Sequence, residues 1–166
     1  MTTVSPMNIN IRKATRADVE LILSLAREFA AFQGSLGKFT NTKERMRDEQ
    51  DCFTCLLAED EAAEAVGLVI YYPVYYTWVG KSLYVDILYV KDTHRGQTIG
   101  YRLLAAVLRV AQAENYQRVR WLVSNWNASA IAFYEKCGAT VSQKEHVCNL
   151  DRQAILAFNQ HAKPHR

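Results

Sequence analysis

The order of elements predicts an α/β domain of three layers, in which helices flank a mixed, mostly antiparallel sheet. Short strand-like runs alternate with amphipathic helical segments along the chain. Two apolar runs, 53–59 and 66–72, are joined by an acidic turn and predict an antiparallel pair. The apolar run 83–90 leads through a short loop into a helix. We expect one domain for the whole length 1–166, because 166 residues suffice for one well-buried core.

The first elements are set by alternation and capping signals, and we expect the ordered core to extend over about residues 7–158. Apolar residues alternate with polar ones from Met7 to Ile11 and predict a strand. The segment Thr15–Asp18 resembles a capping box, which predicts a helix that ends near Phe32. A glycine-containing loop and a short charged helix at 42–50 should follow.

The antiparallel pair should end in an aromatic turn. Pro73 is expected to bend or end the strand 66–72, because proline cannot donate to a ladder. Tyr75, Tyr76 and Trp78 crowd the following turn. They can line a ligand cleft, pack as a cluster or form a subunit contact, and the sequence leaves these alternatives open.

The central strand, 83–90, is apolar apart from Asp86, as in a strand buried on both faces. From about Gly100 the apolar residues follow a helical period. Between them, the loop Arg95–Gly100 contains glycine, which lets a ligand approach, and the new helix directs unpaired N–H groups outward. This geometry suits a phosphate, although an ordinary turn has the same signature. The loop is neither GxGxxG nor GxxxxGK[ST], so neither a dinucleotide fold nor a P-loop is indicated.

The last third of the chain predicts strands and two capped helices. Asn127 and Asp151 are the expected caps, and Gly138 should end the first of the two helices. The expected elements are a strand at 118–123, a helix at 128–136, strands from Val141 and at 147–150, a helix from Asp151 through Phe158 and a frayed tail at 161–166.

Composition narrows the function classes. Twenty Lys and Arg face 17 Asp and Glu without a basic block, so nucleic acid is not an expected partner. No apolar run is long enough to span a membrane and the first residues do not resemble a signal peptide, so we expect a cytoplasmic protein without a membrane partner. Cys52 and Cys55 form a CxxC without a second cysteine pair, so no metal or redox site is expected there.

Two blocks resemble a known superfamily. Arg95-Gly96-Gln97-Thr98-Ile99-Gly100 is similar to the acetyl-CoA signature of GNAT N-acetyltransferases, and Asn127 to Gly138, with Phe133-Tyr134, is similar to their second block. Within the superfamily, the chain resembles the diamine (spermidine/spermine) acetyltransferase group in Tyr71-Tyr72, in 78–86 and in 122–127. The resemblance implies a GNAT fold, acetyl-CoA as co-substrate, N-acetyl transfer to a small primary amine, and a homodimer.

The resemblance also implies the residues that bind the coenzyme. The backbone of the central strand should pair with the pantetheine amides, and N–H groups of the loop should surround the pyrophosphate. The implied residues are Leu88, Tyr89 and Val90 for pantetheine, Gly96, Gln97, Thr98, Ile99, Gly100 and Tyr101 for pyrophosphate, Arg95 for added charge, Asn127 for the pantetheine arm, Cys137 near the coenzyme, and Lys136 for a phosphate or for solvent.

Two catalytic roles follow from the resemblance. Tyr134 should protonate the departing coenzyme sulfur, and its alternative is a buried aromatic residue of the inner helix face. Asp86 stands where relatives carry a glutamate, so it should hold the substrate ammonium and relay its proton. A backbone N–H of the central strand, such as that of Leu88, should stabilise the thioester oxygen as it gains charge.

Departures from the group bear on the substrate. Thr98 replaces a loop glycine, and its Cβ should weaken coenzyme binding if φ is positive. Acidic positions that hold polyamines in relatives are Gln33, Tyr76 and Ile87 here, so a smaller or amino-acid-like amine is favoured over a polyamine. Asp86, Gln33, Tyr76 and Trp78 are the expected substrate-binding residues. The alternatives are a non-catalytic acyl-CoA-binding or regulatory domain and a protein-lysine acetyltransferase.

Overall fold

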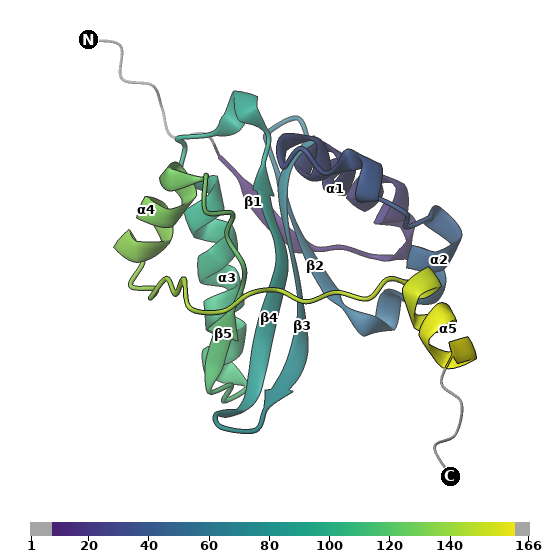
Figure 1. Cartoon of the computed structure of the whole chain (residues 1–166). Coiled ribbons are helices and arrows are strands. Elements are labelled where there is room, and N and C mark those ends of the chain that lie inside the picture. The colour runs from purple at the N-terminus through teal and green to yellow at the C-terminus, as the bar shows by residue number, and fades with distance from the viewer. Residues whose placement is uncertain (1–7, 162–166) are drawn as a thin grey trace. The chain divides into compact units, whose positions relative to one another are not determined.

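A five-stranded sheet in the order β1-β2-β3-β4-β5 forms the centre of the first of two compact units (Figure 1). The computed structural model describes residues 8–161, and its units are Met1–Leu122 and Val123–Arg166. Three strand pairs are antiparallel and β4 with β5 is parallel, which confirms the predicted mixed, mostly antiparallel sheet. The strands are β1 (Asn10–Lys13), β2 (Thr54–Glu59), β3 (Ala65–Tyr76), β4 (Gly80–Val90) and β5 (Arg118–Arg120).

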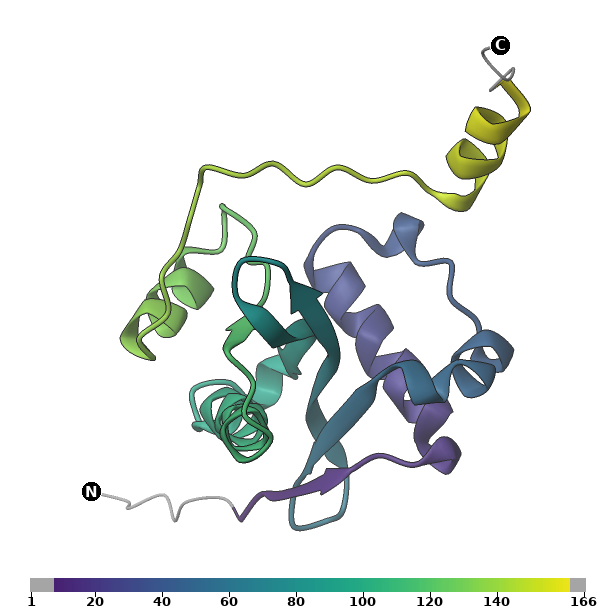
Figure 2. The ribbon, with the colours of Figure 1, turned by 90° about the horizontal axis from the view of Figure 1, so that it is seen from below.

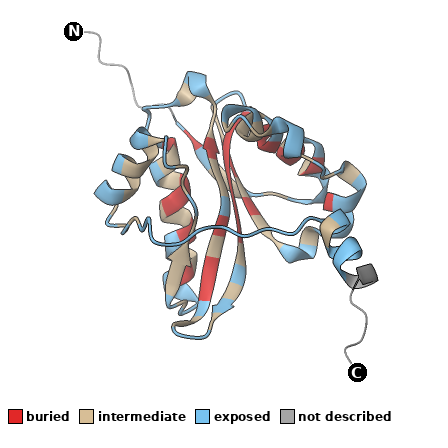
Figure 3. Ribbon diagram, in the orientation of Figure 1, coloured by how far each residue is buried: buried red, intermediate tan, exposed pale blue. Residues whose placement is uncertain are grey.

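Helices cover both faces of this sheet. Figure 2 shows α1 and α3 on opposite sides of the strands. Each helix packs on its own apolar cluster, and Figure 3 shows the buried residues on the central strands and on the inner helix faces. The helices of the first unit are α1 (Val19–Phe32), α2 (Lys43–Asp48) and α3 (Ile99–Ala113), with 3₁₀ turns η1 (Arg16–Asp18), η2 (Leu36–Lys38), η3 (Gln50–Cys52) and η4 (Asp92–His94).

A charged cluster joins β1, β2 and the start of α1. The Thr15 hydroxyl and the Asp18 carboxylate form the predicted capping box. The Arg12 guanidinium donates to both Asp18 oxygens at 2.8 and 2.9 Å, and its Nε donates to Glu59 at 2.7 Å. These hydrogen bonds from Arg12 hold the pKa of Asp18 far below its usual range. The cluster therefore fixes the entry of α1 relative to the sheet.

The prediction that the strand ends or bends at Pro73 was wrong in its end point. The strand continues to Tyr76, and Pro73 lies opposite Leu83 of β4. The pairing of β3 with β2 ends at Tyr71, so beyond this point one side of β3 has no β2 partner. A proline at such an edge removes no ladder hydrogen bond, which explains why the strand is not interrupted.

Gly67 sets the spacing between β3 and the end of β4. A Cβ at Gly67 would lie 2.8 Å from the Tyr89 carbonyl oxygen, 3.3 Å from a Val90 methyl and 3.4 Å from a Leu103 methyl. The contact with a backbone atom cannot be relieved by a side-chain rotation. Glycine is therefore required where β3 pairs with the last residues of β4.

The second unit has two helices, α4 (Ala128–Lys136) and α5 (Arg152–His161). Asn127 Oδ1 accepts from Ala130 N at 3.1 Å, Asp151 Oδ1 accepts from Ala154 N at 2.7 Å, and Gly138 follows α4 with φ of +92°. These contacts confirm the predicted caps.

Several predicted boundaries in the chain were wrong. The strand at 118–123 ends at Arg120, and the helix after Asp151 continues to His161. No described residue from 141 to 150 is in a strand, because this polar and mostly exposed segment has no strand to pair with. β1 begins at Asn10, while Met7 and the tail 162–166 lie outside the described residues.

Candidate functional site

The second half of β4 combines a bulge with an open edge. Ile87 pairs with Ile70 and Val85 pairs with Tyr71, so Asp86 is the extra residue of a β-bulge. On the other side, β5 pairs only with Ser82, Leu83 and Tyr84 (Figure 1). Within residues 8–122, no other strand pairs with β4 beyond Tyr84 on this side. The backbone of 85–90 can therefore accept an extended, amide-containing ligand as an added strand.

The N-terminus of α3 lies just beyond this edge. The first helical hydrogen bond runs from Arg102 N to Thr98 O at 3.0 Å. The N–H groups of Ile99, Gly100 and Tyr101 consequently have no acceptor within the helix. Thr98 occupies the N-cap position, but its side chain makes no cap hydrogen bond. The helix thus presents free donors and the positive end of its dipole, which together suit a phosphate.

Two residues of the loop have left-handed backbone conformations. Gly96 has φ of +76°, which glycine tolerates. Thr98 has φ of +63° and ψ of +3°, which is a strained conformation for a β-branched residue. The predicted conflict at Thr98 is therefore present in the structure. Both residues are exposed at the loop surface.

Arg95 is held against the end of β4. Its Nε donates to the Val90 carbonyl at 3.2 Å and its guanidinium pairs with Asp92 at 2.6 Å. The guanidinium also lies 4.4 Å from the Phe32 ring centroid, which connects the loop to the end of α1. Its charge is shared with Asp92, so Arg95 mainly orders the loop.

The Asp86 carboxylate lies beside a pair of stacked tyrosines. Tyr72 and Tyr84 are register partners on β3 and β4, with ring centroids 5.5 Å apart. Desolvation raises the pKa of Asp86, although the residue remains exposed at the sheet surface. Burial, with the Asp86 charge as the next cause, raises the pKa of Tyr72 to about 12 and also raises the pKa of Tyr84. Both tyrosines therefore remain protonated and can donate beside the carboxylate.

The ring of Tyr76, a predicted substrate residue, forms cation–π contacts with two arginines of the chain. The Arg118 and Arg120 guanidinium carbons lie 4.4 and 5.6 Å from its ring centroid. Neither arginine was expected at the site from the sequence. Their spacing around the inward-facing Val119 is the signal that could have identified them, because alternate strand residues share a face.

Two other predicted substrate residues, Gln33 and Trp78, lie at the end of α1 and in the β3–β4 turn. Gln33 is the C-cap of α1, and its backbone N–H donates to Phe29 O at 2.9 Å. Trp78 is in the turn between β3 and β4 and is 98% exposed, while Tyr75 is 76% exposed. Such exposure excludes these two residues from an aromatic cluster, and leaves a ligand cleft or a subunit contact as their predicted role.

The second unit contains four predicted site residues on or beside α4. Asn127 caps the helix, Lys136 is exposed in its last turn, and Cys137 is the half-buried C-cap. Burial, with a smaller effect of Cys137, raises the pKa of Tyr134 to about 12. A tyrosine with this pKa keeps its proton at neutral pH and can act as a donor.

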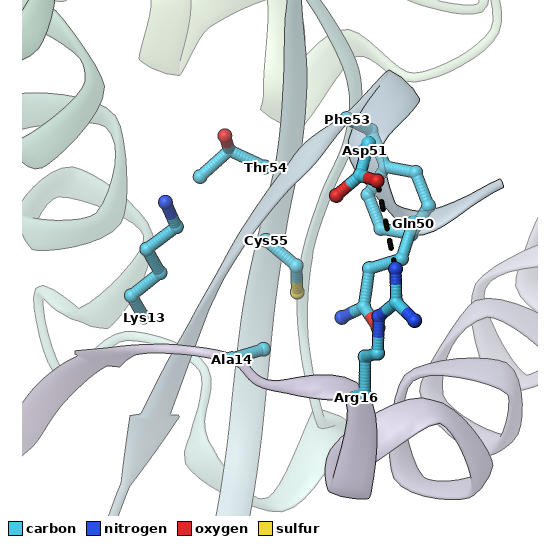
Figure 4. A pocket seen from close by; sticks show the side chains of 8 residues that line it. All are labelled: Lys13, Ala14, Arg16, Gln50, Asp51, Phe53, Thr54 and Cys55. Carbon is cyan, nitrogen blue, oxygen red and sulfur yellow. Dashed lines mark hydrogen bonds and ion pairs between the residues drawn. The ribbon is translucent and has the colours of Figure 1, made fainter. Parts of the chain in front are cut away.

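A separate pocket of about 320 Å³ contains none of the predicted site residues (Figure 4). Figure 4 shows Arg16 and Asp51 paired at 3.5 Å beside the thiol of Cys55. Burial raises the pKa of Cys55 to about 12, and the CxxC cysteines are free. The pocket is lined by Lys13, Ala14, Arg16, Gln50, Asp51, Phe53, Thr54 and Cys55.

Over residues 8–161, no three or more His, Cys, Asp and Glu side chains gather as metal ligands. Among the same residues, none of the helices combines the length and apolarity needed to cross a membrane.

The first unit fits the implied coenzyme. The free edge of β4 offers backbone groups for the peptide-like pantetheine arm, and the α3 N-terminus offers donors for the pyrophosphate. The Thr98 side chain narrows the access of a pyrophosphate to the start of α3, but the backbone N–H groups remain in place. Residues 91–98, with η4, join the edge to the helix N-terminus, and a Cβ at Gly100 would lie 3.8 Å from a Val90 methyl. The two are therefore close in space, as one extended ligand requires.

Comparison with known proteins gives the family. The model of the acetyltransferase (GNAT) family matches residues 20–139. A thialysine N-epsilon-acetyltransferase of Sus scrofa is 32% identical over 143 residues, which cover 80% of this chain and 84% of the relative. The spermidine/spermine N(1)-acetyltransferase-like protein 1 of Homo sapiens is 31% identical over 88% of this chain and 23% of its own length.

Solved structures agree on the fold. An aminoglycoside acetyltransferase from an uncultured soil metagenomic sample has a TM-score of 0.73 at 19% identity, with 86% of this chain and 97% of that chain covered. This likeness shows that the chain shares the fold of that acetyltransferase. The chain belongs to the GNAT family, resembles its diamine acetyltransferase group, and is an acetyl-CoA-dependent N-acetyltransferase.

Proposed function

We propose that this enzyme transfers an acetyl group directly from acetyl-CoA to the primary amine of a small molecule, and that this molecule is amino-acid-like rather than a polyamine. The observation that carries the proposal is the open edge of β4 next to the uncapped N-terminus of α3. The names of relatives, thialysine acetyltransferases, support an amino-acid amine as acceptor. Gln33, Tyr76 and Ile87 stand where the resemblance implies acidic residues that hold polyamines, which argues against a polyamine.

The proposed coenzyme site consists of backbone groups with a few side chains. Acetyl-CoA supplies the acetyl group as a thioester. Backbone groups of 88–90 hold the pantetheine arm, the N–H groups of 96–101 hold the pyrophosphate, and Arg95 orders that loop. The second unit adds Asn127 to the pantetheine arm, with Lys136 and Cys137 near the coenzyme.

Asp86 and Tyr134 are the proposed catalytic residues. Asp86 holds the substrate ammonium and relays its proton away, a role that its raised pKa supports, because a raised pKa makes the carboxylate a stronger base. A backbone N–H of β4, that of Leu88, donates to the acetyl oxygen as it gains charge. Tyr134 donates its proton to the departing sulfur, and its burial supports the protonated state.

The decisive experiment follows free thiol release from acetyl-CoA with a panel of amines. The panel contains thialysine, lysine, ornithine, diamines, spermidine and a lysine-containing peptide. We expect turnover with the amino acids. Coenzyme binding without thiol release from any amine would instead support a non-catalytic acyl-CoA-binding domain, and turnover of the peptide alone would support a protein-lysine acetyltransferase.

Tyr134→Phe tests the proposed acid. Removal of one hydroxyl should lower kcat by about 10²- to 10⁴-fold while the Kd for acetyl-CoA stays within a factor of about two. Tyr116→Phe, at a half-buried tyrosine beside Lys81, is the matched control and should leave kcat as it is. Unchanged turnover of Tyr134→Phe would reject the role of Tyr134.

The proposal includes a cytoplasmic homodimer. The resemblance to the diamine acetyltransferase group supports the dimer, and the exposed Tyr75 and Trp78 are candidates for its contact. All four cysteines are free thiols, as expected for a reducing compartment. Sedimentation equilibrium of the wild type and of Trp78→Ser should show a dimer that the substitution weakens.

A further inference from the structure

Two cations lie on the same face of the sheet as Asp86. Arg118 and Arg120 flank Val119, which packs against the core on the α3 side, so both arginine side chains lie on the opposite face. Their guanidinium groups meet at the ring of Tyr76, at 4.4 and 5.6 Å. Two positive charges therefore share one tyrosine ring near the end of the β3–β4 ribbon.

These cations are not neutralised by the described part of the chain. Neither arginine forms an ion pair with a described residue. The Arg118 Nε is buried and has no hydrogen-bond partner among the residues that the structure describes. A buried donor without an acceptor is costly, and the positive charge of the two arginines favours an anion as their partner.

The Asp86 carboxylate lies on the other side of Tyr84 from these cations. Burial is the main cause that raises the pKa of Tyr84; the Asp86 charge raises it further and the Arg120 charge lowers it, so both groups lie near this tyrosine. In the register, Arg120 is directly opposite Tyr84 and Arg118 is opposite Ser82. Asp86 lies two residues along β4 in the other direction, and no described cation forms an ion pair with it.

The separation of the two charges suits one class of molecule. Asp86 is about 7 Å from Tyr84 along the strand, and Arg120 is about 5 Å across to the neighbouring strand. The guanidinium groups extend toward the Tyr76 ring, so the carboxylate and the cation pair lie farther apart than these backbone positions, with the stacked tyrosines between them. A molecule that bridges them has to be extended and to carry opposite charges at its two ends. A lysine-like or ornithine-like molecule carries the matching charges, an ammonium at one end and a carboxylate at the other.

We propose that Arg118 and Arg120 bind the carboxylate of an amino-acid acceptor whose terminal ammonium lies at Asp86. Guanidinium groups bind carboxylates through paired N–H donors, and Tyr76 holds the two groups in place. A diamine of the same length would instead place a second ammonium beside two guanidinium groups. This inference rests on the proposed acetyl transfer and adds the group that selects the acceptor.

The wild-type enzyme tests the inference with matched acceptors. We compare kcat/KM for lysine and thialysine with kcat/KM for their carboxamides and for the diamine cadaverine. Since hydrogen bonds to a charged group are at stake, the free carboxylate should be preferred by about 10- to 100-fold. Equal kcat/KM for lysine and its carboxamide would overturn the carboxylate site while leaving acetyl transfer intact.

Variants then locate the site. In Arg118→Gln and Arg120→Gln, the ratio of kcat/KM for lysine to that for cadaverine should fall by about tenfold or more, through KM rather than kcat. Arg118→Lys should lose part of this ratio, because an ammonium cannot form the paired bonds. Arg109→Gln, at an exposed arginine of α3, is the matched control and should leave the ratio unchanged. A ratio unaffected by either glutamine variant would contradict the assignment.

A binding measurement separates this inference from the proposed function. Calorimetric titration of the CoA-loaded protein with lysine should give a lower Kd than titration with lysine carboxamide, and Arg120→Gln should abolish the difference. If no amine releases thiol, acetyl transfer fails as the function. If lysine and its carboxamide bind alike, the carboxylate site fails, whether or not thiol is released.

Discussion

Thr98 is in a conformation that its side chain disfavours, at the position where the loop 95–98 becomes α3. A left-handed conformation costs a residue with a Cβ about 1–2 kcal/mol relative to a right-handed one. Thr98 also makes no cap hydrogen bond that would offset this cost. Strain of this kind is common where a backbone has to present its N–H groups to a ligand.

Thr98→Gly should relieve this strain and open the loop. Glycine adopts a φ of +63° without strain, which raises the free energy of unfolding. Its greater freedom in the unfolded chain offsets part of this gain, so the net rise should be about 0.5–1 kcal/mol. The Kd for acetyl-CoA should fall, because a side chain leaves the path to the N–H groups. Thermal unfolding and calorimetric titration measure the two effects.

Ala63→Gly provides the control for Thr98→Gly. Ala63 has φ of +61° in the turn between β2 and β3, far from the loop in the chain. Its substitution should change stability in the same direction and leave the Kd for acetyl-CoA unchanged. Equal changes of Kd in the two variants would show that the coenzyme does not meet Thr98.

At the scale of elements, the Arg12 cluster couples β1, β2 and the start of α1. Asp18→Asn removes the charge that receives two hydrogen bonds from Arg12 and keeps the shape of the cap. Because Asp18 is mostly buried, we expect a loss of about 1–3 kcal/mol in the free energy of unfolding. Arg16→Gln, which removes an exposed pair with Asp51, should cost less than about 0.5 kcal/mol in the same urea titration.

The sequence predicted those elements whose local signals agree with their packing. The capping box at Thr15, the cap at Asn127 and the glycine after α4 depend on a few neighbouring residues, and all are present. The continuation of β3 through Pro73 depends on where β2 ends, which no local pattern encodes. The expected strands after residue 141 failed for the same reason, because a strand needs a partner that its own residues do not specify.

The candidate site was predictable in part. The loop and the α3 N-terminus follow from glycine and helical period, and Thr98 was correctly expected to be in conflict with the loop. The bulge at Asp86 and the early end of β5 could not be predicted, since both are properties of register between strands distant in the chain. The arginines over Tyr76 were missed because their contact joins β3 to β5.

At the scale of the whole molecule, activity and stability should respond to acid at different pH values. Desolvation raises the pKa of Asp86, so on acidification its carboxylate is protonated at a higher pH than that of an ordinary aspartate. The kcat/KM for the amine should fall as the pH decreases through this range. The pKa of Asp18 is lowered, so its contribution to stability is complete above about pH 4 and is lost only as pH falls further.

Parallel pH profiles of kcat/KM and of Tm measure this separation. We expect kcat/KM to decline first, with Tm nearly constant over the same range. Asp86→Asn should abolish the acidic limb of the activity profile along with most of the activity. Coincident decline of activity and Tm would show that unfolding, rather than the protonation of Asp86, limits the enzyme in acid.

The absence of a side chain at Gly67 allows the last residues of β4 to keep their position. A Cβ at Gly67 would lie 2.8 Å from the Tyr89 carbonyl oxygen, so even a methyl group there should displace the last residues of β4, which include those proposed to bind pantetheine. A substitution in β3, outside the proposed coenzyme site, would then lower the affinity for acetyl-CoA by displacing β4. Inherited variation at this one position should accordingly behave like a defect of the active site, although it lies in the hydrophobic interior.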